Sequence, residues 1–387
     1  MKKYTSYILF VIVSLFFTTF NSYSQVSLQG IINKYAVVDS IYPTKDTIEV
    51  ADVTGFNVND TVMIYQAKGS TVYRDTSVLP EQFGNIRTGL KQAGKYEIIL
   101  IKDIVGNKVV FKAVLANSYE AEGLVQLIRV PYFERASINA EVTCKAWDGS
   151  SGGVLALMVS DTLFMNANIN VTGKGFKGAV PKGYSDLGSI ACSATDTSLY
   201  KSYYFNILAD TVMAGLKGES VSVNDSAYIK GRGRWANGGG GGNGRYTGGG
   251  GGGANGPGGN GGAEDTSYCS VEGEVWKNIG GLGGEGLRSV QTQYDDSTIF
   301  LGGGGGSGAF ISGFNATNGG NGGGVVILIV KNIKSNGYNV IANGESVSAV
   351  ATASAGGGGG GGAVIFDVDS LFGSLSISTN GGQGGFV

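Results

Sequence analysis

A missing residue type limits the chemistry open to this chain. Its 387 residues include three Cys and no His. Ser-His-Asp and Cys-His catalysis need an imidazole as general base, and most zinc sites use His or several Cys. We therefore predict no catalytic residues, no metal site and no cofactor site, and we expect a protein that is not an enzyme.

Two glycine motifs imitate functional sites. "GKGFKG" (Gly173–Gly178) matches the dinucleotide pattern GxGxxG, and "GSSGG" (Gly149–Gly153) matches the GxSxG pattern around a nucleophilic Ser. The first requires a following helix, but Pro181 and a stretch without helical periodicity come next. The second requires a general base. We interpret both motifs as turns at the ends of a repeat, and we predict no nucleotide partner.

Carboxylates offer the remaining route to catalysis. Glu264 with Asp265, and Asp295 with Asp296, are the nearest candidates for the carboxylate pair of a glycoside hydrolase. Parallel β-helix lyases can also work with Asp, Lys and Arg alone. No repeated acidic ladder is present, so surface charge is the simpler explanation. A polysaccharide-degrading β-helix enzyme is kept as the alternative function.

Residues 1–24 have the three parts of a secretory signal peptide. Lys2 and Lys3 form the basic start, Tyr7 to Phe17 the apolar stretch, and "NSYS" the polar end before Gln25. A membrane anchor is the alternative, but the apolar stretch is short for a span. We expect an extracellular or cell-surface location.

The charge balance argues against a nucleic-acid partner. Removing Lys2 and Lys3 leaves 26 basic residues against 30 acidic residues. A chain with this balance and no basic face lacks the electrostatic footprint of nucleic-acid binding.

The odd number of Cys allows one disulfide after export. Cys192 and Cys269 both lie in polar loops, and we predict that they pair. Cys144, within "AEVTCKAW", fits a small buried apolar side chain.

Residues 25–135 contain few Gly and many β-branched and aromatic runs separated by turn residues. They predict a small antiparallel β-domain, with a barrel as one form of it. "VGNK" (Val105–Lys108) predicts a tight hairpin between two of its strands.

Residues 136–387 contain an internal repeat, interrupted by an irregular insertion at about 179–230. Three copies start with paired glycines near residues 152, 323 and 361, and each continues with an apolar run. Each copy is expected to hold two short strands, and Leu163, Ile333 and Leu371 hold equivalent places between them. A unit of about 20 residues cannot bury its own apolar face and must stack on its neighbours. We predict an all-β fold with a β-solenoid-like or layered core; three unrelated hairpins in a sandwich are the alternative.

Glycine tracts separate the copies at 231–262, 302–324 and 356–362, within a total of 69 Gly. A flexible tether is one interpretation, but such linkers are rich in Ser. Chains without side chains can instead lie side by side as polyproline-II-like helices, with backbone groups paired between chains. We predict a bundle of glycine helices on the flank of the repeats.

A short motif of Asp, Ser or Thr, and an apolar residue recurs along the chain. It is similar to the O-glycosylation signal of exported Bacteroidota proteins, and strand entries explain it equally well. The motif begins at Asp39, Asp46, Asp60, Asp161, Asp210, Asp225 and Asp369.

Trp235, Arg245 and Tyr246 stand beside the first glycine tract. These residue types favour contact sites, so we predict an exposed contact patch. The equal alternative is that they wedge the glycine bundle against the core.

The order of several segments resembles the N-terminal region of large surface proteins from gliding bacteria, over about residues 45–387. These segments are "GKYE", "VQLIRVP", "WDGSSGGVLAL", "GKGFKG", "KGRGRWANGGGGGNGRYTGGGGGGANGPGGNGG", "IFLGGGGGSG" and "NGGNGGGVVILIV". The family comprises gliding-motility proteins of the AgmC type and gliding-motility-associated proteins of the type IX secretion pathway.

This resemblance implies an exported protein that often continues into repeats and a C-terminal sorting domain. No sorting domain is visible before Val387, so the chain is either a fragment or reaches the surface by another route. Relatives often carry His where "GRYTGG" (Gly244–Gly249) stands here, so no role of such a His transfers to this chain. The family label implies no chemical activity.

We therefore expect a glycine-rich structural or adhesin protein associated with gliding motility or surface attachment. Its expected partners are surface glycans or other cell-surface proteins, and a fixed place in an outer-membrane secretion or motility complex is a further alternative.

Overall fold

The computed structural model describes residues 25–74, 82–181, 214–223, 225–242, 247–262, 280–290, 297–309, 316–347 and 354–386. The fold is all-β, as predicted. Its short helical elements are η2 (Ala121–Gly123), η4 (Ser226–Tyr228) and α2 (Leu287–Val290). Within these ranges, every helix is too short or too polar to cross a membrane.

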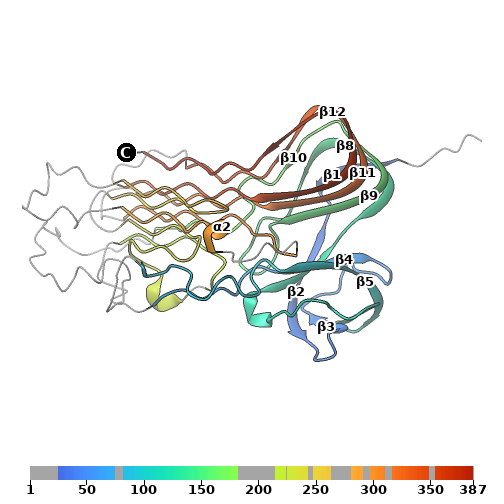
Figure 1. Cartoon of the computed structure of the whole chain (residues 1–387), viewed down its shortest axis with the longest axis horizontal. Helices are drawn as coiled ribbons and strands as arrows, with labels where there is room; N and C mark the ends of the chain where they lie inside the picture. Colours follow the sequence, from blue (N-terminus) through green and yellow to red (C-terminus); the bar gives the residue numbers. More distant parts are fainter. Residues whose placement is uncertain are drawn as a thin grey trace, which may run out of the picture.

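The N-terminal part forms the closed antiparallel barrel that was one predicted form of this region (Figure 1). Around the barrel the strands follow the order β2-β3-β6-β5-β4-β7. Their apolar residues line its interior, where Ile48, Val62 and Leu127 are fully buried. The "VGNK" hairpin joins β5 to β6, and Gly106 in its turn has a φ of 59°. The barrel strands are β2 (Lys34–Ile41), β3 (Thr47–Val50), β4 (Thr61–Gln66), β5 (Tyr96–Val105), β6 (Lys108–Phe111) and β7 (Val125–Arg129).

The repeats stack as a parallel sheet in which each strand forms a rung. Neighbours pair in register, so that Leu163, Ile333 and Leu371 form one column. Leu163 and Ile333 are fully buried, which is how an apolar repeat unit gains stability from its neighbours. The predicted equivalence of the three copies is thus confirmed. The rungs are β1 (Val26–Ile31), β8 (Tyr132–Thr143), β9 (Val154–Met165) with β10 (Ile169–Asn170), β11 (Val325–Ile341) and β12 (Ala363–Ser378).

Two features of the sheet differ from the sequence-based expectation. The copies were expected to hold two short strands each, but β11 runs unbroken for 17 residues and bends at Gly337, whose φ is 87°. In addition, β1 pairs with β8 and belongs to the sheet, although residues 25–135 were assigned to the barrel domain. The rungs β1 and β8 lack glycine tracts on both sides, so the repeat pattern did not mark them.

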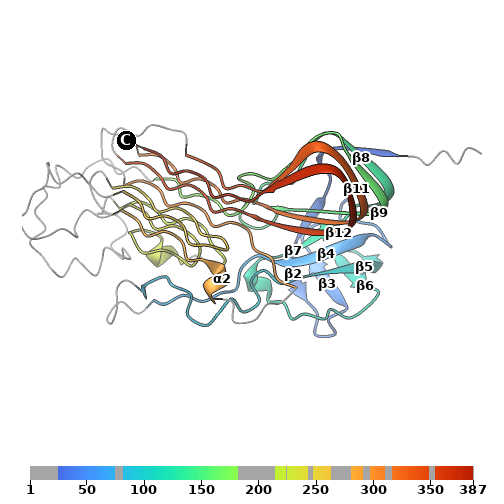
Figure 2. The same cartoon turned by 45° about the horizontal axis from the view of Figure 1, so that its top comes forward.

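Beyond the rungs, the chain enters an array of extended glycine-rich segments that lie side by side (Figure 2). Amide donors along one segment reach three different neighbours in turn, and every third residue returns to the same neighbour. Three residues per turn is the geometry of the polyproline-II helix, so the predicted glycine-helix bundle is confirmed. In the segment 248–253, Gly249 and Gly252 donate to Ala355 and Gly358, Gly250 and Gly253 to Gly240 and Asn237, and Gly248 and Gly251 to Gly262 and Gly259.

At many positions of this bundle only glycine fits, because neighbouring backbones approach closely. None of the described glycines in 238–262 has a positive φ. A Cβ on Gly252 would instead lie 2.0 Å from the carbonyl oxygen of Gly303, and one on Gly357 would lie 2.1 Å from that of Gly250. Backbones packed this closely leave no room for a side chain.

The barrel packs against the parallel sheet near the starts of β9 and β11. Met63 and Ile128 from the barrel share a buried cluster with Ala156 and Ile327 from the sheet. The side-chain Nδ2 of Asn33 donates to the carbonyl oxygen of Ala156 at 2.8 Å. The Tyr35 hydroxyl donates to the carbonyl oxygen of Val154 at 2.7 Å. Through these bonds the barrel covers the open backbone at the start of β9.

Candidate functional site

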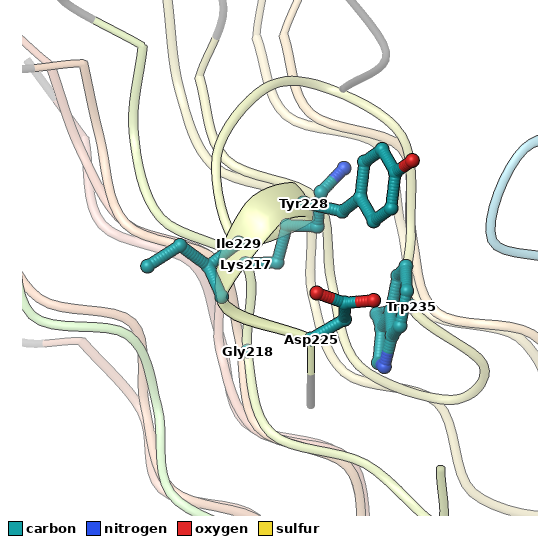
Figure 3. Close-up of a pocket in the computed structure, with 6 residues that line it drawn as sticks. All are labelled: Lys217, Gly218, Asp225, Tyr228, Ile229 and Trp235. Atoms are coloured by element: carbon teal, nitrogen blue, oxygen red, sulfur yellow. The ribbon is translucent and has the colours of Figure 1, made fainter. Parts of the chain in front are cut away.

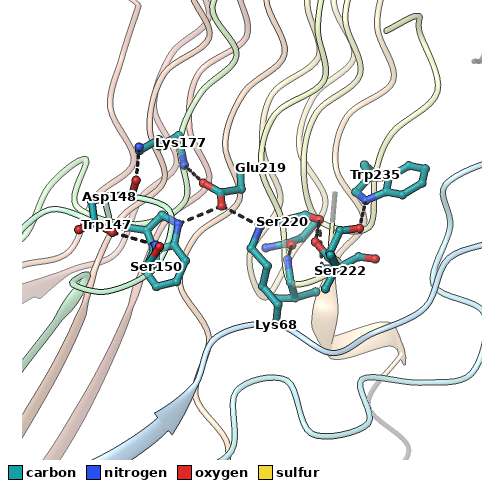
Figure 4. A network of polar contacts seen from close by, with 12 residues as sticks. Lys68, Trp147, Asp148, Ser150, Lys177, Glu219, Ser220, Ser222 and Trp235 are labelled. Atoms are coloured by element: carbon teal, nitrogen blue, oxygen red, sulfur yellow. Dashed lines mark hydrogen bonds and ion pairs between the residues drawn. The ribbon is translucent and has the colours of Figure 1, made fainter. Parts of the chain in front are cut away.

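Lys68 and Glu219 form an ion pair where barrel, sheet and glycine bundle join (Figure 4). Lys68 follows β4, and its Nζ lies 2.7 Å from Oε1 of Glu219, with side-chain exposures of 3% and 11%. Glu219 belongs to the glycine bundle, where its backbone amide donates to Lys177. Trp147, between β8 and β9, donates from Nε1 to the same Oε1 at 3.0 Å. The amide of Lys177 donates to Oε2 at 3.1 Å.

The charges at this junction are arranged to hold the fold together. Burial lowers the pKa of Lys68, and the neighbouring Glu219 carboxylate partly offsets that effect. Both oxygens of Glu219 accept hydrogen bonds from the surrounding chain. A carboxylate engaged in this way holds three parts of the fold together and is poorly placed to act as a general base.

A shallow hollow, open to solvent, lies beside the bundle (Figure 3). Tyr228 and Trp235 stack with ring centroids 6.4 Å apart, and Phe83 lies 6.0 Å from Trp235. Arg74 forms an ion pair with Asp225 at 2.9 Å. The hollow has room for about one water molecule, so it does not enclose a drug-sized ligand, which needs about 300–1,000 Å³. It is lined by Lys217, Gly218, Asp225, Tyr228, Ile229 and Trp235.

Trp235 corrects part of the predicted contact patch. Its side chain is 3% exposed, and its Nε1 donates to the carbonyl oxygen of Val223 at 3.1 Å. Packing against Phe83 places it in the core, so the alternative of a wedge describes it, and exposed contact does not. Arg245 and Tyr246, the other two members of the patch, lie outside the described residues.

Lys217 is a residue that the sequence analysis missed. Its Nζ donates to the carbonyl oxygen of Gly233 at 2.5 Å and lies 5.1 Å from the Phe83 ring centroid. Burial moves the pKa of this ammonium well below its ordinary value. Nothing around Lys217 in the sequence signals burial, because its neighbours in "AGLKGE" carry no strand periodicity.

The two glycine motifs that imitate functional sites, "GSSGG" and "GKGFKG", form turns, as predicted. The side chain of Asp148 accepts from the amides of Ser150 and Ser151 within "GSSGG". Gly173 opens "GKGFKG" with a φ of 65°, and the amide of Gly175 then donates to Gly322 in the glycine bundle.

Cys144 is buried and has a free thiol, and burial raises its pKa to about 12. The predicted disulfide partners Cys192 and Cys269 lie outside the described residues, as do the carboxylates Glu264, Asp265, Asp295 and Asp296. Within the described ranges, no group of three or more Cys, Asp or Glu could hold a metal ion.

No family model matches the chain, and no curated protein matches it. Two solved structures are similar to part of the chain. The Gp54 tailspike of Acinetobacter baumannii bacteriophage AP22, in complex with A. baumannii capsular saccharide, is 15% identical, with 35% of this chain and 21% of that chain covered and a TM-score of 0.20. The tailspike protein gp49 from Pseudomonas phage LKA1 is 16% identical, with 38% and 23% covered and a TM-score of 0.18.

The chain therefore spans about a fifth of the length of these tailspikes. The all-β assignment rests on the strands of this structure themselves.

Proposed function

We propose that this chain is a structural or adhesive module of an exported cell-surface or secreted protein that serves surface attachment or gliding motility. The signal-like residues 1–24 and the resemblance to surface proteins of gliding bacteria support the location and the association with motility. Surface glycans or other cell-surface proteins are the partners of this role, and an outer-membrane secretion or motility complex is the assembly it would join.

One observation carries the proposal. The glycine segments pair through their backbones with a period of three residues, and they continue directly from the stacked rungs. Ordering a glycine costs more backbone entropy than ordering any other residue, and the regular pairing offsets that cost. The result is a rigid body built from backbone, which suits a scaffold that holds contact surfaces away from a cell.

The polar chemistry agrees with a scaffold. The ion pair of Lys68 with Glu219 joins the barrel to the bundle, and the Lys217 ammonium donates a hydrogen bond to the carbonyl oxygen of Gly233. These buried charges bond to other parts of the fold and so help to fix how those parts are arranged.

Binding and turnover assays on the same samples test the proposal. The purified chain is incubated with acidic and neutral polysaccharides, and with whole cells whose surface glycans have been removed or left intact. We expect glycan-dependent retention and no shortening of any polysaccharide. Measurable cleavage would favour the enzyme alternative, and equal retention on intact and stripped cells would remove glycans as the partner.

A further inference from the structure

Among the described strands, β12 is the last rung of the stack, and its outer edge has no neighbouring strand. β12 pairs with β11 on one side, and it forms the end of the sheet order (Figure 1). Leu371 is 45% exposed although its column partners Leu163 and Ile333 are fully buried. Ile377 is 48% exposed above the fully buried Val340. The apolar columns thus stop where another rung would bury them.

β12 repeats the residue types of β9, two rungs below. Asp369-Ser370-Leu371-Phe372 matches Asp161-Thr162-Leu163-Phe164 residue by residue. The register through β11 aligns Thr162 with Ser370, Leu163 with Leu371, and Phe164 with Phe372. β12 therefore presents outward the same short template that β9 presents to its neighbour.

On β9 that template is covered by a basic rung. Lys334 of β11 places its Nζ 5.5 Å from the Phe164 ring centroid. The side-chain amide of Asn332 donates to the carbonyl oxygen of Asp161 at 3.1 Å. Lys331 lies between Val330, which pairs with Val159, and Asn332, which pairs with Thr162, so this register irregularity sets it opposite Ser160 and Asp161. The β11 residues that face this segment of β9 are thus Lys331, Asn332 and Lys334.

Cations alternate with aromatic rings and carboxylates along the stack. Arg135 of β8 pairs with Asp161 at 2.8 Å and lies 5.9 Å from the Phe164 ring. Lys334 of β11 also lies 5.9 Å from the Phe372 ring. The series runs from a basic rung through an acidic-aromatic rung to a basic rung, and ends on the acidic-aromatic rung β12. A cation placed over Phe372 and Asp369 would continue it.

We propose that the β12 edge binds one further parallel rung, contributed by a partner polypeptide with the β11 pattern: an apolar strand entered from glycines, with Lys or Arg at the two positions that face Asp369 and Phe372. Main-chain pairing supplies the affinity of an added strand, and the side-chain columns supply its specificity. The glycines entering the partner strand would extend the bundle beside residues 356–362.

A head-to-tail second copy is a poor occupant of this edge. At the opposite end of the stack the barrel covers the start of β9 through Asn33 and Tyr35. The strand β1 at that end spans six residues, against 16 for β12. A second copy could therefore pair along only part of the edge.

A peptide of residues 322–346, the chain's own β11 rung, is the probe. Its binding to the full chain is measured by fluorescence anisotropy at low ionic strength and again at high ionic strength. We expect saturable one-to-one binding. A peptide with Lys331→Glu and Lys334→Glu should bind about tenfold more weakly or worse, because like charges would then face each other.

A charge exchange separates this recognition from general stickiness of an exposed strand. Asp369→Lys in the full chain should weaken binding of the unaltered peptide and restore part of the binding of a third peptide, which carries Lys331→Glu alone. The matched control is Asp39→Lys, at an exposed position on β2, which should leave both affinities unchanged.

Three results would overturn the proposal. The first is no binding of the unaltered peptide, and the second is equal binding of the basic and acidic peptides. The third is self-association of the full chain that Asp369→Lys abolishes, because a second copy would then be the occupant.

Discussion

Lys68 and Glu219 form a buried ion pair, 2.7 Å between Nζ and Oε1, that joins the barrel to the glycine bundle. The two residues are far apart in the sequence, and neither belongs to a regular strand. Their pairing fixes the orientation of the glycine array relative to the barrel, and Trp147 adds the sheet to the same carboxylate.

Glu219→Gln should destabilise the chain by about 3–5 kcal/mol, because it leaves the Lys68 ammonium buried without a countercharge. Adding Lys68→Met should recover part of this loss, since the uncompensated charge is then removed. The measurement is the free energy of unfolding in urea. Lys145→Met is the control, because its pair with Asp148 has exposures of 40% and 47% and should contribute about 0–1 kcal/mol. A Glu219→Gln variant as stable as this control would contradict the assigned role.

Gly252→Ala and Gly259→Ala test the packing of the bundle. A Cβ on Gly252 would lie 2.0 Å from the oxygen of Gly303, whereas a Cβ on Gly259 meets nothing within 4 Å. Neither glycine has a positive φ, so the backbone conformation suits Ala at both positions. We expect Gly252→Ala to cost about 3 kcal/mol or more through overpacking.

Gly259→Ala should be neutral or stabilise the chain by up to about 1 kcal/mol, through the unfolded state. Thermal and urea unfolding of the two variants measure the contrast. Equal small effects would show that the segments are loosely packed in solution.

The stacked core of the rungs could be predicted from the sequence because the same pattern of glycines and apolar residues recurs in each copy. The apolar runs after paired glycines identified Leu163, Ile333 and Leu371 as equivalents, and the strand register agrees. The glycine bundle also followed, since long tracts with little Ser joining ordered strands leave few other ways to satisfy the backbone.

The candidate site could not be read from the sequence in the same way. Trp235 is buried by Phe83, which lies about 150 positions earlier in the chain, and no local pattern links the two. Lys217 and Lys68 look like ordinary surface lysines, because burial of a charge depends on tertiary neighbours that have no periodic signature. The strand β1 joined the sheet for a similar reason, since six residues of β pattern do not indicate which sheet they enter.

Cys144 should react slowly with thiol reagents in the folded chain. Its side chain is buried, and burial raises its pKa to about 12, so little thiolate forms at pH 8. Alkylation with iodoacetamide, followed by peptide mass spectrometry, should label Cys144 in urea and leave it largely unmodified in native buffer. Rapid native labelling would show that this part of the sheet opens readily.

Lys217 should make stability depend on alkaline pH. Burial lowers its folded-state pKa well below the value of 10.5 that holds for the unfolded chain. Between these two values the unfolded chain binds more protons than the folded chain, so the free energy of unfolding rises with pH. Below the folded pKa the burial penalty is present in full, and above 10.5 it is fully relieved.

The Lys217→Met variant lacks this titration, while all other groups titrate in both proteins. The free energy of unfolding of the natural chain minus that of the variant should therefore increase from neutral pH toward pH 10.5. Urea unfolding of both proteins at several pH values across this window measures the difference. A difference that stays constant would mean that water reaches the Lys217 ammonium in the folded chain, and the packing of Phe83 around it would then need revision.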